Sequence, residues 1–384
     1  MNIAIITLYH ESENYGGLFQ AYALQKYLET IGNNVVQIDY EKKEREAVHG
    51  FLKKLKKYGV AYCARRCWEI PLSNITGRYD NEIIRKYNSS FQRKKEKFTK
   101  FRNMIPHTET YDNESIYEIS ETYDMYVAGS DQIWNPEYWC DAYFLKFVKG
   151  KRKVAISAST GVEQISKKHE VYLRQCLQDF EYISVRENRS QTCIQSYWDG
   201  NVNVLIDPVF LLDVLEWEKV EKKYELGVKD YIFCYLLGKE KKVHKKIRKI
   251  AEKIGLPIVY LCFSQPKYYK NECEFGDVQL YDVGPREFIY LLRKSQYVIT
   301  DSFHGTAFSI LFNKQFWTLP RYHLGIKKSS DRIKTILGML GIKKRMISIH
   351  SIRKWNDCIQ WDYPNQKLKS EKETIKKEIN SLIY

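Results

Sequence analysis

Thr300–Ala307 is the segment whose side chains are best suited to chemistry. It reads TDSFHGTA and lies between a β-type run and an apolar helical run, so it is predicted to be a loop that opens a helix. Backbone N–H groups at a helix start attract anions, and His304 beside such an anion is a candidate general acid, because imidazole titrates near neutrality. Asp301 is a candidate base, and the residues predicted to bind the anion are Ser302, Gly305 and Thr306. The competing interpretation is that Asp301 or Ser302 only caps the helix and that His304 serves the loop.

A second polar segment, Val127–Pro136, also follows a predicted strand and begins with a glycine turn. Carboxylate and amide side chains bind hydroxyl groups, and an indole offers a flat apolar face on which a sugar ring can stack. We therefore predict that Asp131 is a second candidate base and that a hydroxyl-rich ligand contacts Ser130, Gln132, Trp134 and Asn135. Turn chemistry accounts for the glycine, serine and proline of this segment, but it does not account for the tryptophan.

Two shorter polar segments also directly follow predicted strands. Arg186 follows the predicted strand Tyr182–Val185, and its planar guanidinium suits two-pronged binding of a carboxylate or phosphate. A surface pair of Arg186 with Glu187 is the competing interpretation. Near the N-terminus, His10–Gly17 connects a strand to an amphipathic helix, and its paired glycines allow the backbone to approach a ligand. The residues predicted to lie against that ligand are Asn14, Tyr15, Gly16 and Gly17.

The elements that must position these segments alternate between strands and helices. Ile3–Leu8, Gly17–Thr30 and Val35–Tyr40 read as a strand, a helix and a second strand, and further short β-type runs continue to Val202–Ile206. A second alternating series begins at Tyr231. This order predicts an α/β protein of two Rossmann-like, doubly wound domains that face each other across a cleft, with ligands bound outside the carboxyl ends of the strands.

The predicted domain boundaries follow from this pattern. The N-terminal domain spans 1–207 and carries a basic helical insertion at about 45–113, and the C-terminal domain spans 208–349. Residues 350–384 form a tail that is expected to pack back on the N-terminal domain.

The charge balance favours anionic partners. The 384-residue chain has 62 Lys and Arg against 47 Asp and Glu, a formal net charge of +15. Much of the excess lies in Phe51–Trp68 and Arg85–Arg102, which read as helices with a basic face. Such helices are either solvated or dock on an anionic membrane. No motif of the common nucleic-acid-binding modules is present, so nucleic acid is not a predicted partner.

Compartment and metal content follow from what the sequence lacks. It has no signal-peptide pattern and no apolar run long enough to span a bilayer, and its nine cysteines are scattered without the spacing of a zinc site. We therefore expect reduced thiols, no metal, and a cytoplasmic protein, peripheral on the inner face of the plasma membrane if the basic helices bind lipid.

Taken together, four segments resemble the polysaccharide pyruvyl transferase family. They are NYGGLFQAYALQKYL at Asn14–Leu28, YDMYVAGSDQIWN at Tyr123–Asn135, VREN at Val185–Asn188 and TDSFHGTAFSILFNK at Thr300–Lys314. They stand in the family's order and span most of the chain. The sequences GSDQIWN and DSFHGTAFSILFNK are the specific signals, and VREN gains weight from its place between them.

The resemblance implies a fold of the GT-B type and phosphoenolpyruvate as donor and co-substrate, without a further cofactor. It implies that His304 and Arg186 are required, that Arg186 binds donor together with the helix start of the C-terminal domain, and that the N-terminal domain binds acceptor. The implied product is a pyruvate ketal on a sugar of a bacterial surface polysaccharide or of its lipid-linked oligosaccharide precursor. The family pattern is not recognisable in Arg45–Asn113 or after residue 350, so the acceptor sugar is not identified.

Two other functions fit the same fold. A nucleotide-sugar glycosyltransferase would usually place a carboxylate for the ribose diol in the second domain, whereas the helix after His304 and Gly305 reads TAFSILFNK and has no acidic residue. A non-catalytic component of polysaccharide assembly would carry the same residues without turnover.

Overall fold

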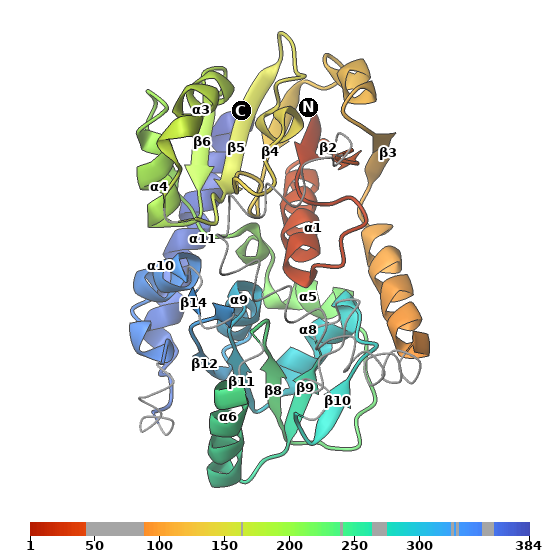
Figure 1. The fold of residues 1–384 in the computed structure, drawn as a ribbon, viewed down its shortest axis with the longest axis vertical. Helices are drawn as coiled ribbons and strands as arrows, with labels where there is room; N and C mark the ends of the chain where they lie inside the picture. The colour runs from red at the N-terminus through yellow and green to blue at the C-terminus, as the bar shows by residue number, and fades with distance from the viewer. Residues whose placement is uncertain are drawn as a thin grey trace, which may run out of the picture.

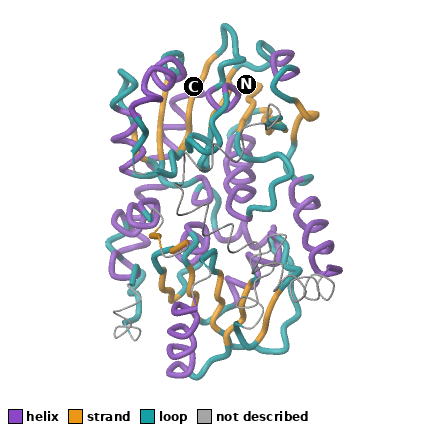
Figure 2. Tube along the Cα trace, in the orientation of Figure 1, coloured by secondary structure: helices purple, strands orange, loops and turns teal. Residues whose placement is uncertain are grey.

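The computed structural model contains two parallel β-sheets, one in each domain, with helices around them (Figure 1). The structure describes the whole chain except residues 44–87, 163, 239–240, 263–274, 324–325, 328–329 and 348–356. Figure 2 shows the strands of the two sheets in separate groups, with loops and helices between them. The α/β fold of two doubly wound, Rossmann-like domains is thus the predicted one.

The N-terminal sheet has seven strands in the order β3-β2-β1-β4-β5-β6-β7. All pairs are parallel, because helices or long connections return the chain between strands. The central strands are buried, as expected where both faces of a parallel sheet are covered. Its strands are β1 (Asn2–Ile6), β2 (Asn34–Tyr40), β3 (His107–Tyr111), β4 (Met125–Ala128), β5 (Arg152–Ala158), β6 (Tyr182–Val185) and β7 (Asn203–Val204).

The C-terminal sheet has five parallel strands in the order β10-β9-β8-β11-β12. These are β8 (Ile232–Tyr235), β9 (Ile258–Leu261), β10 (Val278–Leu280), β11 (Tyr297–Thr300) and β12 (Gln315–Thr318). A separate antiparallel pair follows, β13 (Tyr322–His323) with β14 (Ile326–Lys327).

The helices alternate with the strands. They are α1 (Tyr15–Thr30), a helix over 88–102, α3 (Glu170–Leu177), α4 (Asn188–Gln195), α5 (Val214–Val220), α6 (Lys241–Ile254), α8 (Pro285–Lys294), α9 (Phe303–Leu311), α10 (Asp331–Met339) and α11 (Asp362–Ile383). Short 3-10 helices are η1 (Ser115–Ile119), η2 (Asp141–Phe144), η3 (Lys167–His169), η4 (Pro208–Phe210) and η5 (Lys343–Arg345). In the part of the chain that the structure describes, no helix is both long and apolar enough to cross a membrane.

The two domains share one apolar core at their junction, and α1 is its centre. Phe19 on α1 packs against Phe308 on α9, with ring centroids 4.8 Å apart, and against Trp217 on α5 at 5.8 Å. Burying several aromatic side chains between the domains resists their separation, since each carries a large apolar area. The junction is therefore a packed interface, with polar residues at one part of it.

The last helix returns to the N-terminal domain, and both chain ends lie there (Figure 1). On α11, Asn380 accepts a hydrogen bond from the Tyr27 hydroxyl at 3.1 Å, and the Leu382 carbonyl accepts one from Arg152 at 2.6 Å. The tail therefore ties the two ends of the chain to one domain.

The predicted basic insertion is only partly described. Phe51–Trp68 lies outside the described residues, and 88–102 is helical as expected. This second helix is not simply a solvated face, because its Phe98 and Phe101 side chains are buried at the domain junction, with Phe98 4.7 Å from the Tyr15 ring. Strand β3 also falls inside the predicted insertion and belongs to the N-terminal sheet.

Candidate active site

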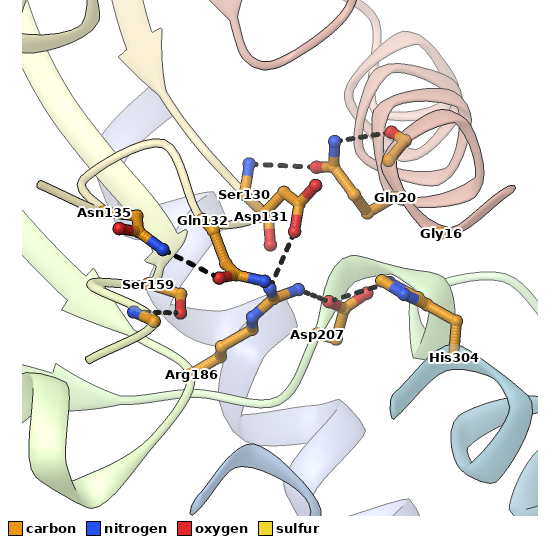
Figure 3. A network of polar contacts seen from close by, with 12 residues as sticks. Gly16, Gln20, Ser130, Asp131, Gln132, Asn135, Ser159, Arg186, Asp207 and His304 are labelled. Carbon is orange, nitrogen blue, oxygen red and sulfur yellow. Dashed lines mark hydrogen bonds and ion pairs between the residues drawn. The ribbon is translucent and has the colours of Figure 1, made fainter. Parts of the chain in front are cut away.

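Polar side chains from both domains meet where the strands' carboxyl ends face the junction (Figure 3). Asp131 follows β4, Arg186 follows β6, and Asp207 comes just after β7. From the other domain, His304 stands in the first turn of α9, directly after β11. Parallel strands end at the same edge of a sheet, so residues far apart in the chain are brought together here.

A buried ion chain forms the centre of the site. Arg186 Nη1 donates to Asp207 Oδ2 at 2.6 Å, and its Nη2 donates to Asp131 Oδ1 at 2.9 Å. The Arg186 side chain is 0% exposed. Burial would lower the pKa of Arg186, but the carboxylates of Asp131 and Asp207 raise it above its ordinary value. Because both Nη groups are engaged, Arg186 could contact a donor anion through them only by releasing Asp131 or Asp207.

His304 joins this chain through Asp207. His304 Nε2 lies 3.5 Å from Asp207 Oδ2, in a place shielded from solvent, while Asp207 Oδ1 accepts the backbone N–H of Val209 at 3.0 Å. Burial acts to raise the pKa of Asp207, but the nearby His304 and Arg186 outweigh it and hold that pKa well below its usual range. The ionised carboxylate of Asp207 thus faces the Nε2 side of the imidazole, and the Nδ1 side faces the first turn of α1.

Gly16 of α1 lies directly against the His304 ring. A Cβ built on Gly16 would stand 1.8 Å from His304 Nδ1, far inside any real contact. The glycine therefore lets an imidazole of the C-terminal domain rest on the first turn of a helix of the N-terminal domain. This is the physical basis for the paired glycines at this helix start.

Gly16→Ala is expected to displace the His304 ring and to lower turnover by about 100-fold or more, because small misplacements of a reacting group are this costly. Gly227→Ala is the matched control, since a Cβ there would meet no atom within 4 Å. Steady-state rates and melting curves of both variants check this. If Gly16→Ala keeps wild-type activity, His304 does not act from its position against Gly16.

Asp131 has one oxygen toward the ion chain and the other toward α1. Its backbone has φ +60°, after a cis peptide bond between Gly129 and Ser130. A Cβ on Gly17 would lie 3.3 Å from Asp131 Oδ2, so this oxygen faces the helix start. Burial acts to raise the pKa of Asp131, but Arg186, His304 and Arg332 together lower it below its ordinary value. The carboxylate is thus ionised beside the candidate acid.

The other residues of the Asp131 loop have structural partners. Ser130 is buried, and its hydroxyl donates to the Ser157 carbonyl at 3.0 Å. The prediction that Ser130 contacts a ligand is therefore wrong. The amides of Gln132 and Asn135 contact each other at 3.1 Å. Both lie against Gly161, where a Cβ would stand 2.3 Å from the end of the Gln132 amide group. Of this loop, Asp131 and Gln132 remain closest to the junction's charged groups.

Trp134 is not the sugar platform that the sequence suggested. Its side chain is 0% exposed, its indole N–H donates to the Tyr143 carbonyl at 3.1 Å, and its ring stacks on Phe144 with centroids 5.8 Å apart. Turn chemistry does not account for a tryptophan at this position. The tryptophan is there because its side chain fills the apolar core beneath the turn.

Trp134→Ala is therefore expected to destabilise the protein by about 3–5 kcal/mol, the usual cost of emptying a large aromatic site. Tyr117→Ala, at a side chain that is 46% exposed, should cost far less. Urea unfolding measures both. If Trp134→Ala leaves the stability unchanged and raises the Michaelis constant for acceptor, the prediction that a sugar stacks on Trp134 would be supported after all.

The predicted anion-binding residues at α9 are mostly used by the helix itself. Ser302 caps it by accepting the Gly305 N–H at 3.3 Å, which is the competing interpretation of the sequence. Gly305 packs on the preceding strand, where a Cβ would stand 2.5 Å from the Thr300 hydroxyl oxygen. Thr306 is buried and donates to the Ser302 carbonyl at 2.9 Å. The prediction that these three bind an anion is not supported by their contacts.

Asp301 binds the backbone of the loop that follows β8. Its two carboxylate oxygens accept the backbone N–H groups of Leu237 at 2.7 Å and Gly238 at 2.8 Å. Burial raises the pKa of Asp301, and the charge of Arg321 offsets only part of this effect. Of the two candidate bases, the structure places Asp131 beside His304 and gives Asp301 to the chain after β8.

At the start of α1, two predicted ligand residues are also structural. Asn14 is exposed and caps the helix by accepting the Gly16 N–H at 3.1 Å. Tyr15 is buried, and its hydroxyl donates to the Val283 carbonyl of the other domain at 2.6 Å. Tyr15 therefore ties the two domains together and does not face the site.

Sequence reasoning missed Asp207 and Arg332. In the sequence, Asp207 marks only the end of the predicted N-terminal domain, yet it stands just after a strand, which is the same signal that identified Asp131 and Arg186. Arg332 gave no such signal, because it lies on α10, far from any recognised motif. Among the residues that the structure describes, no three His, Cys, Asp or Glu side chains are grouped as metal ligands would be.

Comparison with solved structures shows the type of fold. The chain is similar to UDP-GlcNAc 2-epimerase from Neisseria meningitidis bound to UDP-GlcNAc, with 10% identity, a TM-score of 0.53 and 100% of each chain covered. It is also similar to UDP-GlcNAc 2-epimerase from Methanocaldococcus jannaschii, with 12% identity, a TM-score of 0.50, and 97% of this chain and 92% of that chain covered. At these identities the likeness shows the fold alone, which is the expected GT-B type.

Sequence comparison identifies the family. Among curated proteins, none matches the chain. The sequence model of the family described as polysaccharide pyruvyl transferase matches residues 14–321, which is most of the chain and includes every motif of the site. The protein therefore belongs to the polysaccharide pyruvyl transferase family.

Proposed function

We propose that this enzyme transfers the pyruvyl group of phosphoenolpyruvate to two hydroxyls of one sugar, forming a cyclic ketal and releasing phosphate. The proposed acceptor is a bacterial surface polysaccharide such as a capsule or exopolysaccharide, or its lipid-linked oligosaccharide precursor. No cofactor beyond the co-substrate phosphoenolpyruvate is required in this proposal. The enzyme would act in the cytoplasm, where both phosphoenolpyruvate and lipid-linked precursors are available.

The observation that carries the proposal is the buried chain His304–Asp207–Arg186–Asp131 at the domain junction. It holds an imidazole and an ionised carboxylate in one place, with Arg186 paired to Asp207 at 2.6 Å and to Asp131 at 2.9 Å. A fixed imidazole is suited to proton transfer. A carboxylate held within the same network is suited to receive a hydroxyl proton.

In the proposed reaction, His304 gives a proton to the methylene carbon of phosphoenolpyruvate, which leaves an oxocarbenium-like centre at the adjacent carbon. A first sugar hydroxyl adds to that centre and gives its proton to Asp131. Phosphate leaves, and the second hydroxyl forms the second C–O bond of the ketal. The two hydroxyl protons balance the reaction: one replaces the proton of His304, and the other leaves with phosphate.

Release of inorganic phosphate from phosphoenolpyruvate, dependent on acceptor, tests this function. The protein is incubated with phosphoenolpyruvate and a panel of lipid-linked oligosaccharides and polymers, and the products are analysed by mass. A pyruvyl ketal with matching phosphate release supports the proposal.

The rival functions give different results in the same assay. Transfer from a nucleotide sugar, without use of phosphoenolpyruvate, would replace the proposal with glycosyl transfer. Turnover of neither donor with any acceptor would favour a non-catalytic role in polysaccharide assembly. Docking on an anionic membrane, proposed from the basic segment Phe51–Trp68, is tested separately by vesicle binding at low and high salt, because that segment lies outside the described residues.

A further inference from the structure

The proposed donor is an anion, but both Nη groups of Arg186 are already engaged within the protein. Both its Nη groups bind carboxylates, and its side chain is 0% exposed. To bind a ligand's phosphate directly, Arg186 would have to release Asp131 or Asp207, which would leave a carboxylate buried without its partner. The site therefore needs a different cation for the donor.

Arg332 is a guanidinium in the right place without a carboxylate partner. No ion pair joins it to an acidic side chain within the parts of the chain that the structure describes, whereas Arg186, Arg189 and Arg321 each have one. It is half-buried. Burial first, and the charge of Arg186 next, lower the pKa of Arg332 to about 10, while the charges of Glu187 and Asp131 act in the opposite direction.

Two contacts place Arg332 at the domain junction, beside α9. Its guanidinium carbon lies 5.9 Å from the centre of the Phe303 ring, next to His304 in the chain, and Arg186 lies 5.0 Å from the same ring. The Gln132 amide of the N-terminal domain also lies against Arg332: when its oxygen is turned toward α10 instead of toward Asn135, it accepts from Arg332 Nη1 at 2.9 Å and Nη2 at 3.0 Å. A neutral amide orients the guanidinium without neutralising it.

We infer that Arg332, and not Arg186, binds the phosphate group of the donor. A guanidinium that makes no ion pair and lies against a neutral amide at a domain junction is suited to bind an anion with a planar pair of acceptor oxygens. Arg186 is then a positioning residue, which holds Asp131 and Asp207 in place. This inference rests on the proposed use of phosphoenolpyruvate, but the anion site can be tested without turnover.

Binding of two probes, inorganic phosphate and phosphoenolpyruvate, tests the inference in the full-length protein. Each is titrated by calorimetry into the wild type, Arg332→Gln, Arg332→Lys and the control Lys334→Gln, an exposed residue on the same helix. We expect Arg332→Gln to weaken both probes by about tenfold or more, the usual effect of losing charge-assisted hydrogen bonds. Arg332→Lys keeps the charge without the fork and should fall between, and Lys334→Gln should match the wild type.

The outcomes separate this inference from the proposed function. Loss of phosphate binding in Arg332→Gln supports the anion site even if the wild type never turns over phosphoenolpyruvate, a result that would overturn only the proposed function. Equal binding of both probes by the wild type and Arg332→Gln, or no phosphate binding by the wild type, overturns the inference. If Arg332→Gln does not fold, as judged by circular dichroism, the Arg332→Lys titration decides in the same way.

Discussion

Replacing His304 with alanine is expected to reduce acceptor-dependent phosphate release by about 10²–10⁴-fold, the usual contribution of a positioned acid. The reason is the position of the imidazole, a titratable group that lies between Asp207 and Gly16 at the domain junction. Binding of phosphoenolpyruvate should weaken much less, because the proposed phosphate ligand is Arg332. Initial rates and calorimetric donor affinity measure the two effects separately.

A control must show that the loss comes from chemistry and not from folding. His169→Ala is suitable, since its ring packs on Trp139, with centroids 5.2 Å apart, and not on a residue of the junction. Both alanine variants should keep the wild-type circular dichroism spectrum. If His304→Ala stays within about tenfold of wild-type activity, a loss of only ~1.4 kcal/mol, an essential acid is ruled out.

Asp207→Asn should damage both stability and activity. It leaves the buried Arg186 with only one directly bonded carboxylate, and breaking a buried ion pair in this way typically costs about 3–5 kcal/mol. It also removes the charge that orients His304, so phosphate release should fall by about 100-fold or more. Glu225→Gln is the control, since that side chain is 83% exposed and pairs only at the surface with Lys223.

The pH dependence of this variant's stability has a definite sign. The folded-state pKa of Asp207 is depressed, so its contribution to stability is complete above the unfolded pKa of about 4 and is lost as pH falls through the lower folded value. The stability gap between wild type and Asp207→Asn should be undiminished at pH 5 and should narrow only below about pH 4. Urea unfolding across this range measures it. A gap that closes between pH 7 and 5 would show that Asp207 is not held by His304 and Arg186.

Sequence patterns are enough to predict the architecture and the position of the candidate site along the chain. Alternating apolar runs specify parallel strands and helices, and polar turns after β4, β6 and β11 mark the carboxyl edge where such sheets bind ligands. These signals are local, because strand periodicity, glycine turns and helix caps depend on residues close in sequence. For the same reason, His304 and Asp131 could be selected before any contact was known.

What each of these residues contacts depends on the tertiary structure. Burial of Trp134 and the pairing of Arg186 with Asp207 depend on which elements pack together, and packing is not encoded in local spacing. The same holds for Gly16, whose missing Cβ makes room for an imidazole from the opposite end of the chain. A buried charge must find its partner wherever the fold places one, so the ion chain, and the lone guanidinium of Arg332, became visible only when the two domains were brought together.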